Sequence, residues 1–537
     1  MFLKETKVKR KSGRTVTYLQ LVTTIWDKER KTPRHKVMCS FGRLDRLDKS
    51  QIQNLVDKLS TYLEEPKVTP DDLLKVGETL EFGVPYLVQG VWKTLRLDRF
   101  FAEQLKKRKY EKPVHQAILG MVMNRCQHPY SKRATDEWLS GDVYFPPAKE
   151  LELQHYYRGM DFLLDTGQEL ELALYDHYNR LFKRTTDMVF YDTTSSYFET
   201  DNEQDDELRQ YGYSRDHRPD CKQILLGMAV DKDGLPLASD IFSGGTQDVE
   251  TVKQMVAKLK GLGVQRCIFI SDSGMISKEN LDAMEEAGLD TLMGTRMRQL
   301  TEIQQQVLSK RGRFTQLPQE DLPGLGVKEV PMDGYRYVVV YNEKQARKDA
   351  HIRTEVVARL EELLTKIEAG KATVCEIQHP LMKRFVRVLK DGKVKLNATK
   401  VREDAIYDGK YVLRTTSGLG VADIVVAYKT LHRIEQGFRT IKTVLKIRPM
   451  YHHADHRIIS HVKLCVLAYF IVRYVEVKTG QSWDHIAKLF FKLHVVELVT
   501  NAGVVFRSSA LSKEHKEVLK ALRIPFPKEI QGVQLKS

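Results

Sequence analysis

The sequence predicts an α/β protein whose centre is a mixed sheet packed between helices. Short apolar runs typical of buried strands cluster after Asp187. Segments with the 3.6-residue period of amphipathic helices alternate with the later runs, and a long, mainly helical stretch precedes them all. Strands that first cluster and then alternate with helices are typical of a mixed sheet covered by helices.

The composition indicates a folded, basic protein. Its 537 residues are enough for roughly three or four domains at ~150 residues each. The chain has 86 basic and 71 acidic residues, a net charge of +15. Such an excess favours a polyanionic partner, because each phosphate that is neutralised releases counterions. Taken alone, the charge fits a nucleic-acid partner and a merely solvated basic surface equally well.

Cysteine spacing and hydropathy favour a cytoplasmic protein. None of the six Cys pairs in a Cys-x-x-Cys motif, and Cys267 and Cys465 lie inside apolar runs as small core residues would. The first residues lack the apolar stretch of a signal peptide. The longest apolar run, Leu464–Val472, is too short to span a bilayer, so no membrane association is expected.

Two regions precede the central sheet. Residues 1–66 are predicted to form a small α+β module, with strands over Thr15–Thr24 and His35–Cys39 and a helix over Gln51–Leu63. Its basic start is either a DNA-binding arm or a solvated end, and the basic balance of the whole chain favours the arm. Residues 67–183 are predicted to be helical and to bind DNA, although they lack a clear helix-turn-helix signature.

The central domain is expected in two parts, 184–294 and 421–476, separated by a β-rich insertion over 295–420. A final helical region, 477–537, is a candidate for dimerisation. Helical periodicity predicts one helix from Ala422 to about Lys446 and a more buried one over Ile458–Tyr474. The strands expected in the first part are Met188–Tyr191, Ile224–Val230, Leu235–Phe242, Cys267–Ser271 and Thr291–Met293.

Asp192 and Asp272 each follow an apolar run, and we expect both at the carboxyl ends of strands. If the two strands are neighbours, the carboxylates converge. Because close carboxylates repel unless a cation lies between them, a metal site would resolve the repulsion. The simpler alternative is that either Asp only caps the following helix or turn.

Glu435 is a lone carboxylate on a basic helix. Tyr428, Glu435 and Lys442 are seven residues apart and form one stripe, with Arg439 beside it. Glu435 is therefore either half of a surface salt bridge or a metal ligand among phosphate-binding groups. Scarcity of acid favours the metal ligand: between 428 and 463, two acidic residues stand against eight basic ones, Lys429, Arg433, Arg439, Lys442, Lys446, Arg448, Arg457 and Lys463.

Several ordered motifs resemble those of one enzyme family. They are Tyr-Asp-Thr-Thr-Ser (191–195), Gly-Tyr-Ser-Arg-Asp-His-Arg-Pro-Asp (212–220), Phe-Ser-Gly-Gly-Thr-Gln-Asp (242–248), Ser-Asp-Ser-Gly-Met (271–275), and the 428–442 block followed by Ile-Arg-Pro-Met-Tyr-His-His. With these motifs the chain resembles the DDE transposases of bacterial insertion sequences that carry a Tyr-Arg-Glu-Lys signature. The nearest branch is the one named after insertion sequence sixteen thirty-four, a relative of the insertion-sequence-four group.

The resemblance implies an RNase H-like catalytic domain whose metal ligands and catalytic residues are Asp192, Asp272 and Glu435. It implies two Mg²⁺ or Mn²⁺ ions. It also implies that Tyr428 and Lys442 contact DNA phosphates. The signature's Arg would fall three residues after Tyr428, where the chain has Leu431, so Arg433 or Arg439 is expected to take its place.

The implied activity is DNA cleavage and strand transfer of an insertion sequence. The implied partners are double-stranded DNA with terminal inverted repeats, target DNA and a second copy of the chain in the synaptic complex. The implied setting is the nucleoid of a bacterium or archaeon.

Two other functions stay open: an RNase H-like nuclease without strand transfer, and an inactive DNA-binding protein derived from a transposase. A zinc site at the His452–His461 group is disfavoured, because no Cys/His spacing supports it. His461 is instead expected to pack or hydrogen-bond near the active helix.

Overall fold

The computed structural model describes residues 2–9, 15–27, 32–48, 50, 56, 75–108, 110, 113–182, 186–199, 207–264, 267–310, 312–317, 324–389, 393–500 and 503–535. They divide into two compact units. One comprises residues 1–78, 496–507 and 529–537, and the other comprises residues 79–495 and 508–528.

An antiparallel sheet at the N-terminus contains β1 (Phe2–Lys9), β2 (Thr15–Asp27) and β3 (Thr32–Arg43) in that order. Both strands expected in this module are confirmed. The helix predicted over 51–63 lies outside the described residues. A second sheet has the order β18-β17-β16-β4, with bounds Ile530–Leu535, Gly503–Ser508, His494–Thr500 and Lys75–Glu81.

The C-terminal region was expected to be helical, and this expectation is wrong. Helices α16 (Trp483–Phe491) and α17 (Lys513–Ala521) alternate there with β16, β17 and β18. The sequence His-Val-Val-Glu-Leu-Val-Thr of β16 is rich in β-branched residues, which pack well on a pleated surface.

The expected helical region is confirmed. Its members are α2 (Gly83–Thr94), α3 (Leu97–Arg108), α4 (Pro113–Gln127), α5 (Lys132–Gly141), α6 (Leu153–Asp165) and α7 (Gly167–Phe182). Pro85 lies in the first turn of α2, where its missing N–H leaves no helical hydrogen bond unmade. Helix α4 packs against α2, α6 and α15, so it is buried on most sides.

The central sheet has nine strands in the order β10-β11-β12-β15-β9-β8-β5-β6-β7. Strand β5 pairs antiparallel with β6, which pairs antiparallel with β7, while β8 and β9 run parallel to β5. All five strands expected in the first part are present, as β5 (Met188–Tyr197), β6 (Gln223–Val230), β7 (Pro236–Ser243), β8 (Ile268–Ser271) and β9 (Asp290–Gly294).

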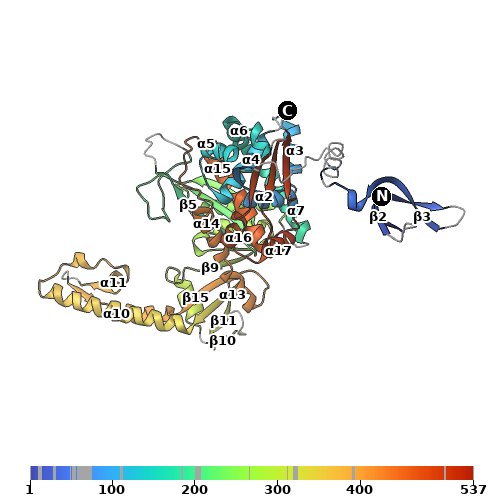
Figure 1. Cartoon of the computed structure of the whole chain (residues 1–537). Helices are drawn as coiled ribbons and strands as arrows, with labels where there is room; N and C mark the ends of the chain where they lie inside the picture. Colours follow the sequence, from blue (N-terminus) through green and yellow to red (C-terminus); the bar gives the residue numbers. More distant parts are fainter. Residues whose placement is uncertain are drawn as a thin grey trace. The chain divides into compact units, whose positions relative to one another are not determined.

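Helices cover both faces of this sheet (Figure 1). Because side chains alternate along a strand, Val189 and Tyr191 pack with apolar residues of α8 (Asp248–Gly261) and α9 (Lys278–Glu286). Phe190 belongs to the other core, with residues of α14 (His432–Thr443) and α15 (Asp455–Thr479). The result is a sheet buried between two helical layers.

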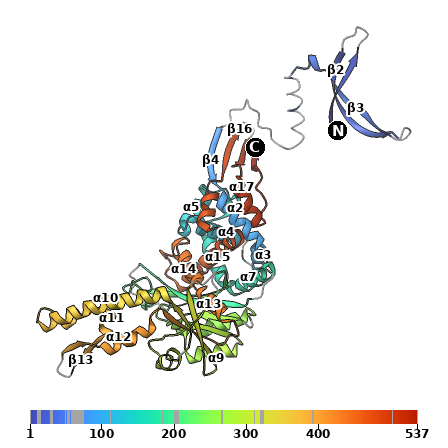
Figure 2. The same cartoon turned by 90° about the horizontal axis from the view of Figure 1, so that it is seen from below.

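The segment 295–420 is not a separate β-rich insertion. Its strands β10 (Thr315–Gln316), β11 (Leu325–Met332), β12 (Tyr335–Asn342) and β15 (Lys410–Thr415) extend the central sheet, because β15 pairs with both β12 and β9. Its longest element is a helix, α10 (Glu343–Glu368), drawn in yellow in Figure 2. With α10, a small satellite core is formed by α11 (Pro380–Arg384), β13 (Val386–Val388), β14 (Val394–Leu396) and α12 (Ala398–Asp404).

The helix expected over 422–446 is two helices, α13 (Val421–Lys429) and α14. The chain turns at Thr430 and Leu431, where the amide of Leu431 bonds to the carbonyl of Tyr428 at 3.1 Å instead of continuing the α-helical pattern. The Thr430 hydroxyl also bonds back to the carbonyl of Val426, a contact that favours a bend.

Helix α15 confirms the expected buried helix. It is long and apolar enough to cross a membrane by length and composition, with a mean hydropathy of 1.7 over its most apolar 18 residues. However, 78% of that stretch is buried inside the protein, which is the environment of a core helix.

Candidate active site

Asp192 lies in the middle of β5, not at the carboxyl end of a strand as expected. The strand continues because the following Thr-Thr-Ser-Ser-Tyr keeps pairing with β6, as far as Tyr197 opposite Gln223. Asp192 is two residues from Phe190 and therefore lies on the face covered by α14 and α15. One of its carboxylate oxygens accepts a hydrogen bond of 2.7 Å from the amide of Thr193.

The surroundings of Asp192 favour its neutral form. Burial raises the pKa of Asp192 to about 7, and the nearby carboxylates of Asp248 and Asp272 act in the same direction. The Thr193 amide and Arg215 oppose this rise only in part. Asp192 and Asp272 therefore lie close enough to repel each other when both are ionised.

Asp272 directly follows β8, as predicted, and is exposed. It occupies the position before a single turn of 3-10 helix, Ser273–Met275, but its side chain makes no capping hydrogen bond there. The capping role considered above for Asp272 is therefore not what the structure shows.

Tyr428 connects Asp272 with Glu435. Burial raises the pKa of the Tyr428 hydroxyl, and Asp272, which hydrogen-bonds with it, and Glu435 raise it further. The Tyr428 ring stacks on Tyr411 at a centroid distance of 6.2 Å, and its hydroxyl fits against Gly294 at the end of β9, where any larger residue would clash. Glu435 is exposed in the first turn of α14, the positive end of that helix.

The three carboxylates thus come from β5, from the loop after β8 and from α14; the charge of Asp272 acts on both Asp192 and Tyr428, and that of Glu435 acts on Tyr428. Among the described residues, no group of three or more His, Cys, Asp or Glu is already arranged to hold a metal ion.

Lys442 is held by an acidic residue that the sequence did not single out. Its ammonium lies 3.1 Å from both carboxylate oxygens of Asp216, and the guanidinium of Arg448 lies 3.2 Å from one of them. Burial lowers the pKa of Lys442, while Asp216 raises it. The adjacent Arg215 donates 2.7 Å hydrogen bonds to Asp248 and to the hydroxyl of Thr193, next to Asp192.

The sequence signal for Arg215 and Asp216 is the 212–220 motif, which contains both. Its residues act as a bridge between the central strand and α14. Arg448 lies outside that motif, and its pairing with Asp216 depends on the fold.

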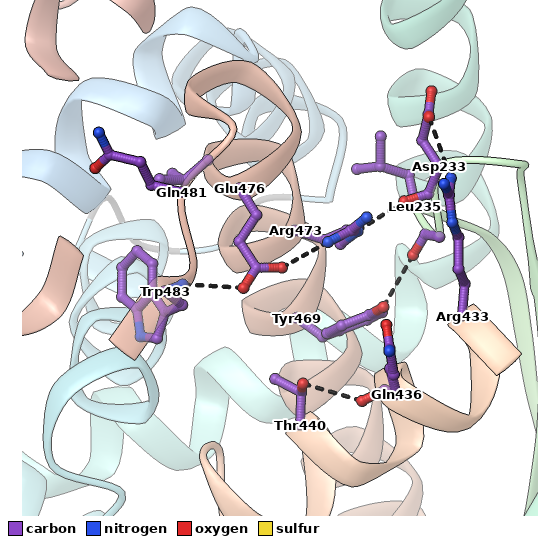
Figure 3. A network of polar contacts seen from close by, with 12 residues as sticks. Asp233, Leu235, Arg433, Gln436, Thr440, Tyr469, Arg473, Glu476, Gln481 and Trp483 are labelled. Carbon is purple, nitrogen blue, oxygen red and sulfur yellow. Dashed lines mark hydrogen bonds and ion pairs between the residues drawn. The ribbon is translucent and has the colours of Figure 1, made fainter. Parts of the chain in front are cut away.

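Arg433 and Arg439 lie in different surroundings. Arg433 is half-buried, and its guanidinium bonds to the backbone carbonyl of Lys232 and lies 3.5 Å from the Asp233 carboxylate in the turn between β6 and β7 (Figure 3). It would have to leave these contacts to bind DNA. Arg439 is exposed on α14.

Comparisons with known proteins place this geometry in a family. Residues 186–471, more than half of the chain, match the family described as transposase DDE domain, and residues 3–71 match the N-terminal domain of IS1634 family transposases. The chain belongs to the DDE transposases of the IS1634 family. The matched DDE region contains all three carboxylates and the strands that carry them.

A solved structure, a piggyBac transposase synaptic complex with hairpin DNA, shares a remote likeness. Its TM-score is 0.36 and its identity 10%, over 71% of this chain and 70% of that one. The search of curated proteins finds no match.

As a DDE transposase, the protein is an enzyme of DNA transposition that cleaves DNA and transfers the cut strands. Members of this family generally use divalent metal ions.

Proposed function

We propose that Asp192, Asp272 and Glu435 are the catalytic carboxylates of this transposase and hold two Mg²⁺ or Mn²⁺ ions. The observation that carries this proposal is their proximity: the charge of Asp272 contributes to the raised pKa of Asp192, and the charges of Asp272 and Glu435 both raise the pKa of Tyr428. These residues are 243 positions apart in the chain at their extremes, so only the fold brings them together.

The strand arrangement supports an RNase H-like core. In the part β7-β6-β5-β8-β9, three antiparallel strands are followed by two that run parallel to β5. Asp192 lies on the central strand of the five, Asp272 follows its parallel neighbour, and α14 packs on β5 and β6.

The side chains fit hard divalent cations. All three provide carboxylate oxygens, the ligands that Mg²⁺ prefers. The charge of Asp272 raises the pKa of Asp192, and a cation between the two carboxylates would offset this repulsion. Bound there, the ions would activate the attacking oxygen and stabilise the leaving oxygen of the phosphodiester.

The chain's own groups would position the DNA. Lys442 and Arg448 already bind an anion, the Asp216 carboxylate. A DNA phosphate is also an anion and would bind to the same two cations. Tyr428 would orient Asp272 through its hydroxyl. The expected substrates are double-stranded DNA with terminal inverted repeats and a target duplex, handled by a homodimer that pairs both ends.

The test is cleavage of a DNA fragment that carries the element's ends, in Mg²⁺ and in EDTA, with Asp192→Asn. We expect the variant to lose cleavage by ~10³-fold or more, because a lost metal ligand removes several kcal/mol of transition-state stabilisation. End binding should persist. Asp282→Asn, an exposed change on α9, is the matched control and should cleave normally.

Cleavage by Asp192→Asn at the wild-type rate would reject the site assignment. Cuts by the wild type at random positions, with no joining to a second DNA, would favour the nuclease alternative. Binding without any metal-dependent cut would favour the inactive derivative.

A further inference from the structure

A cavity of about 610 Å³ lies between the end of α4, the start of α5 and the connection from α14 to α15. Its lining includes Arg125, Lys132, Arg133 and Lys446, together with His452 and His461. None of the described residues that line it is Asp or Glu. The cavity is therefore strongly positive.

The charge of Lys132 has no partner. Its side chain is 4% exposed and lines the cavity, yet within the described part of the chain it makes no ion pair or hydrogen bond. Arg125 is 5% exposed, and among the described residues its guanidinium bonds only to backbone carbonyls, those of Leu445, Lys446 and Tyr130 at 3.4, 3.1 and 3.0 Å. A buried charge without a counter-charge is costly, and an anion in the cavity would remove that cost.

His461 has an unused polar atom in the same place. Its Nε2–H donates to the carbonyl of Ile447 at 3.1 Å, which confirms the expected hydrogen bond near the active helix, while Nδ1 is buried without a partner. Burial lowers the pKa of His461, and Arg125 and Lys132 add to this effect. Burial also lowers the pKa of Lys132 to about 7. A bound anion would favour the protonated form of both groups, and a protonated His461 would donate to it from Nδ1.

Helix α5 adds a further positive element. It begins at the cavity with Lys132 and Arg133, after the cap Ser131, whose hydroxyl accepts from the amide of Ala134 at 3.2 Å. The positive end of a ten-residue helix thus opens into the space that holds the unpaired ammonium.

We propose that this cavity binds a backbone phosphate of DNA. The connection that lines it begins after Thr443, the last residue of α14 and the neighbour of Lys442, and contains Arg448, which pairs with Asp216 beside the catalytic strand. A duplex held by Lys442 and Arg448 would therefore continue over Lys446 toward Lys132. This inference requires that the transposase binds DNA, and it is independent of which carboxylates hold metal.

The experiment measures DNA affinity against salt concentration for the full chain, with a duplex of the element's end and Lys132→Met. We expect the affinity to fall about tenfold at ~0.1 M salt and the slope of log K against log salt to fall by about 1, as for one lost phosphate contact. Lys520→Met, an exposed change on α17, is the matched control for loss of one positive charge and should leave both values unchanged.

Thermal denaturation separates binding from folding. Without anions, Lys132→Met should be at least as stable as the wild type, because it removes an uncompensated buried charge. Inorganic phosphate should raise the wild-type Tm and leave the Tm of Lys132→Met unchanged. Lys446→Met, at an exposed position on the rim, should lower the affinity in the same way and replaces Lys132→Met if that variant fails to fold.

Wild-type affinity and salt slope in both variants would overturn the proposal. A phosphate-dependent Tm without any change in DNA binding would overturn it too, since the cavity would then hold a free small anion. If the wild type binds DNA through Lys132 but never cuts it, the proposed catalytic site is contradicted and the proposal for the cavity stands.

Discussion

The fold shifts the ionisation of Asp192 by burying its carboxyl. Without metal, its raised pKa of about 7 means that the folded chain holds this proton more tightly than the unfolded chain, where an Asp titrates near ~4. Its stabilising contribution is fully present below about pH 4 and is lost as the pH rises through about 7. The metal-free protein should therefore weaken over this range.

Comparison with Asp192→Asn isolates the effect, because Asn cannot ionise. In EDTA, we expect the variant to become more stable than the wild type by roughly 1–3 kcal/mol as the pH rises from 5 to 8. Denaturant unfolding at several pH values measures the difference. A difference that stays constant with pH would show that Asp192 does not titrate in this range.

Asp216 forms ion pairs with Lys442 and Arg448, the two cations proposed to bind DNA phosphates. Removing its charge with Asp216→Asn should free Lys442 and Arg448 and raise DNA affinity several-fold at low salt, since two more cations would face the phosphates. Fluorescence anisotropy measures this. Asp220→Asn changes the net charge equally on the same loop but releases only the half-buried Arg218, so it should have a smaller effect.

The three proposed catalytic carboxylates could be predicted from the sequence because each has a distinctive neighbourhood, two beside apolar runs and one on an acid-poor helix. The roles of Asp216 and Lys132 could not be predicted in this way. Asp216 pairs with Lys442, which is 226 positions away in the chain. Lys132 faces a cavity that residues from several helices enclose.

At the scale of elements, periodicity located most helices and strands because a buried face is a local property of the sequence. It could not give the pairing of β15 with β9, in which Leu413 faces Gly294 across more than 100 intervening residues. It also missed the break between α13 and α14, where hydrogen bonds of the Thr430 turn end an otherwise helical pattern.

Gly437 sets how closely α14 approaches α15. A Cβ at this position would lie 2.6 Å from the hydroxyl of Tyr469, which donates to the carbonyl of Gly234 at 2.9 Å. Gly437→Ala should destabilise the protein by roughly 1–3 kcal/mol, as overpacking does. It should also slow cleavage, because Glu435 is carried by the displaced helix. Thermal denaturation and the cleavage assay measure the two effects.

Gly141, at the end of α5, is the matched control. Nothing lies within 4 Å of a Cβ there, so Gly141→Ala should be neutral or stabilising by up to ~1 kcal/mol. Equal stability and activity of both variants would mean that α14 can shift without consequence for the site.

At the scale of the whole molecule, charge is distributed unevenly. Residues 1–66 contain 15 Lys and Arg and 8 Asp and Glu, a net charge of +7. This segment is about an eighth of the chain but carries nearly half of its net charge of +15. The same segment covers most of the match to the IS1634 N-terminal domain. The other compact unit has hydrophobic cores of its own, so we expect it to fold without residues 1–66.

Deleting residues 1–66 should therefore leave the main thermal transition in place while it lowers DNA affinity and flattens its dependence on salt, since fewer counterions are released. The triple change of Lys4, Lys7 and Lys9 to Gln keeps β1 but removes three charges, and it should reproduce about three units of the lost salt slope if each Lys contacts a phosphate. Equal salt slopes for the wild type and the deletion would contradict a DNA-binding role. A deletion that weakens binding much more than the triple change would show that the module reads bases or DNA shape besides phosphate charge.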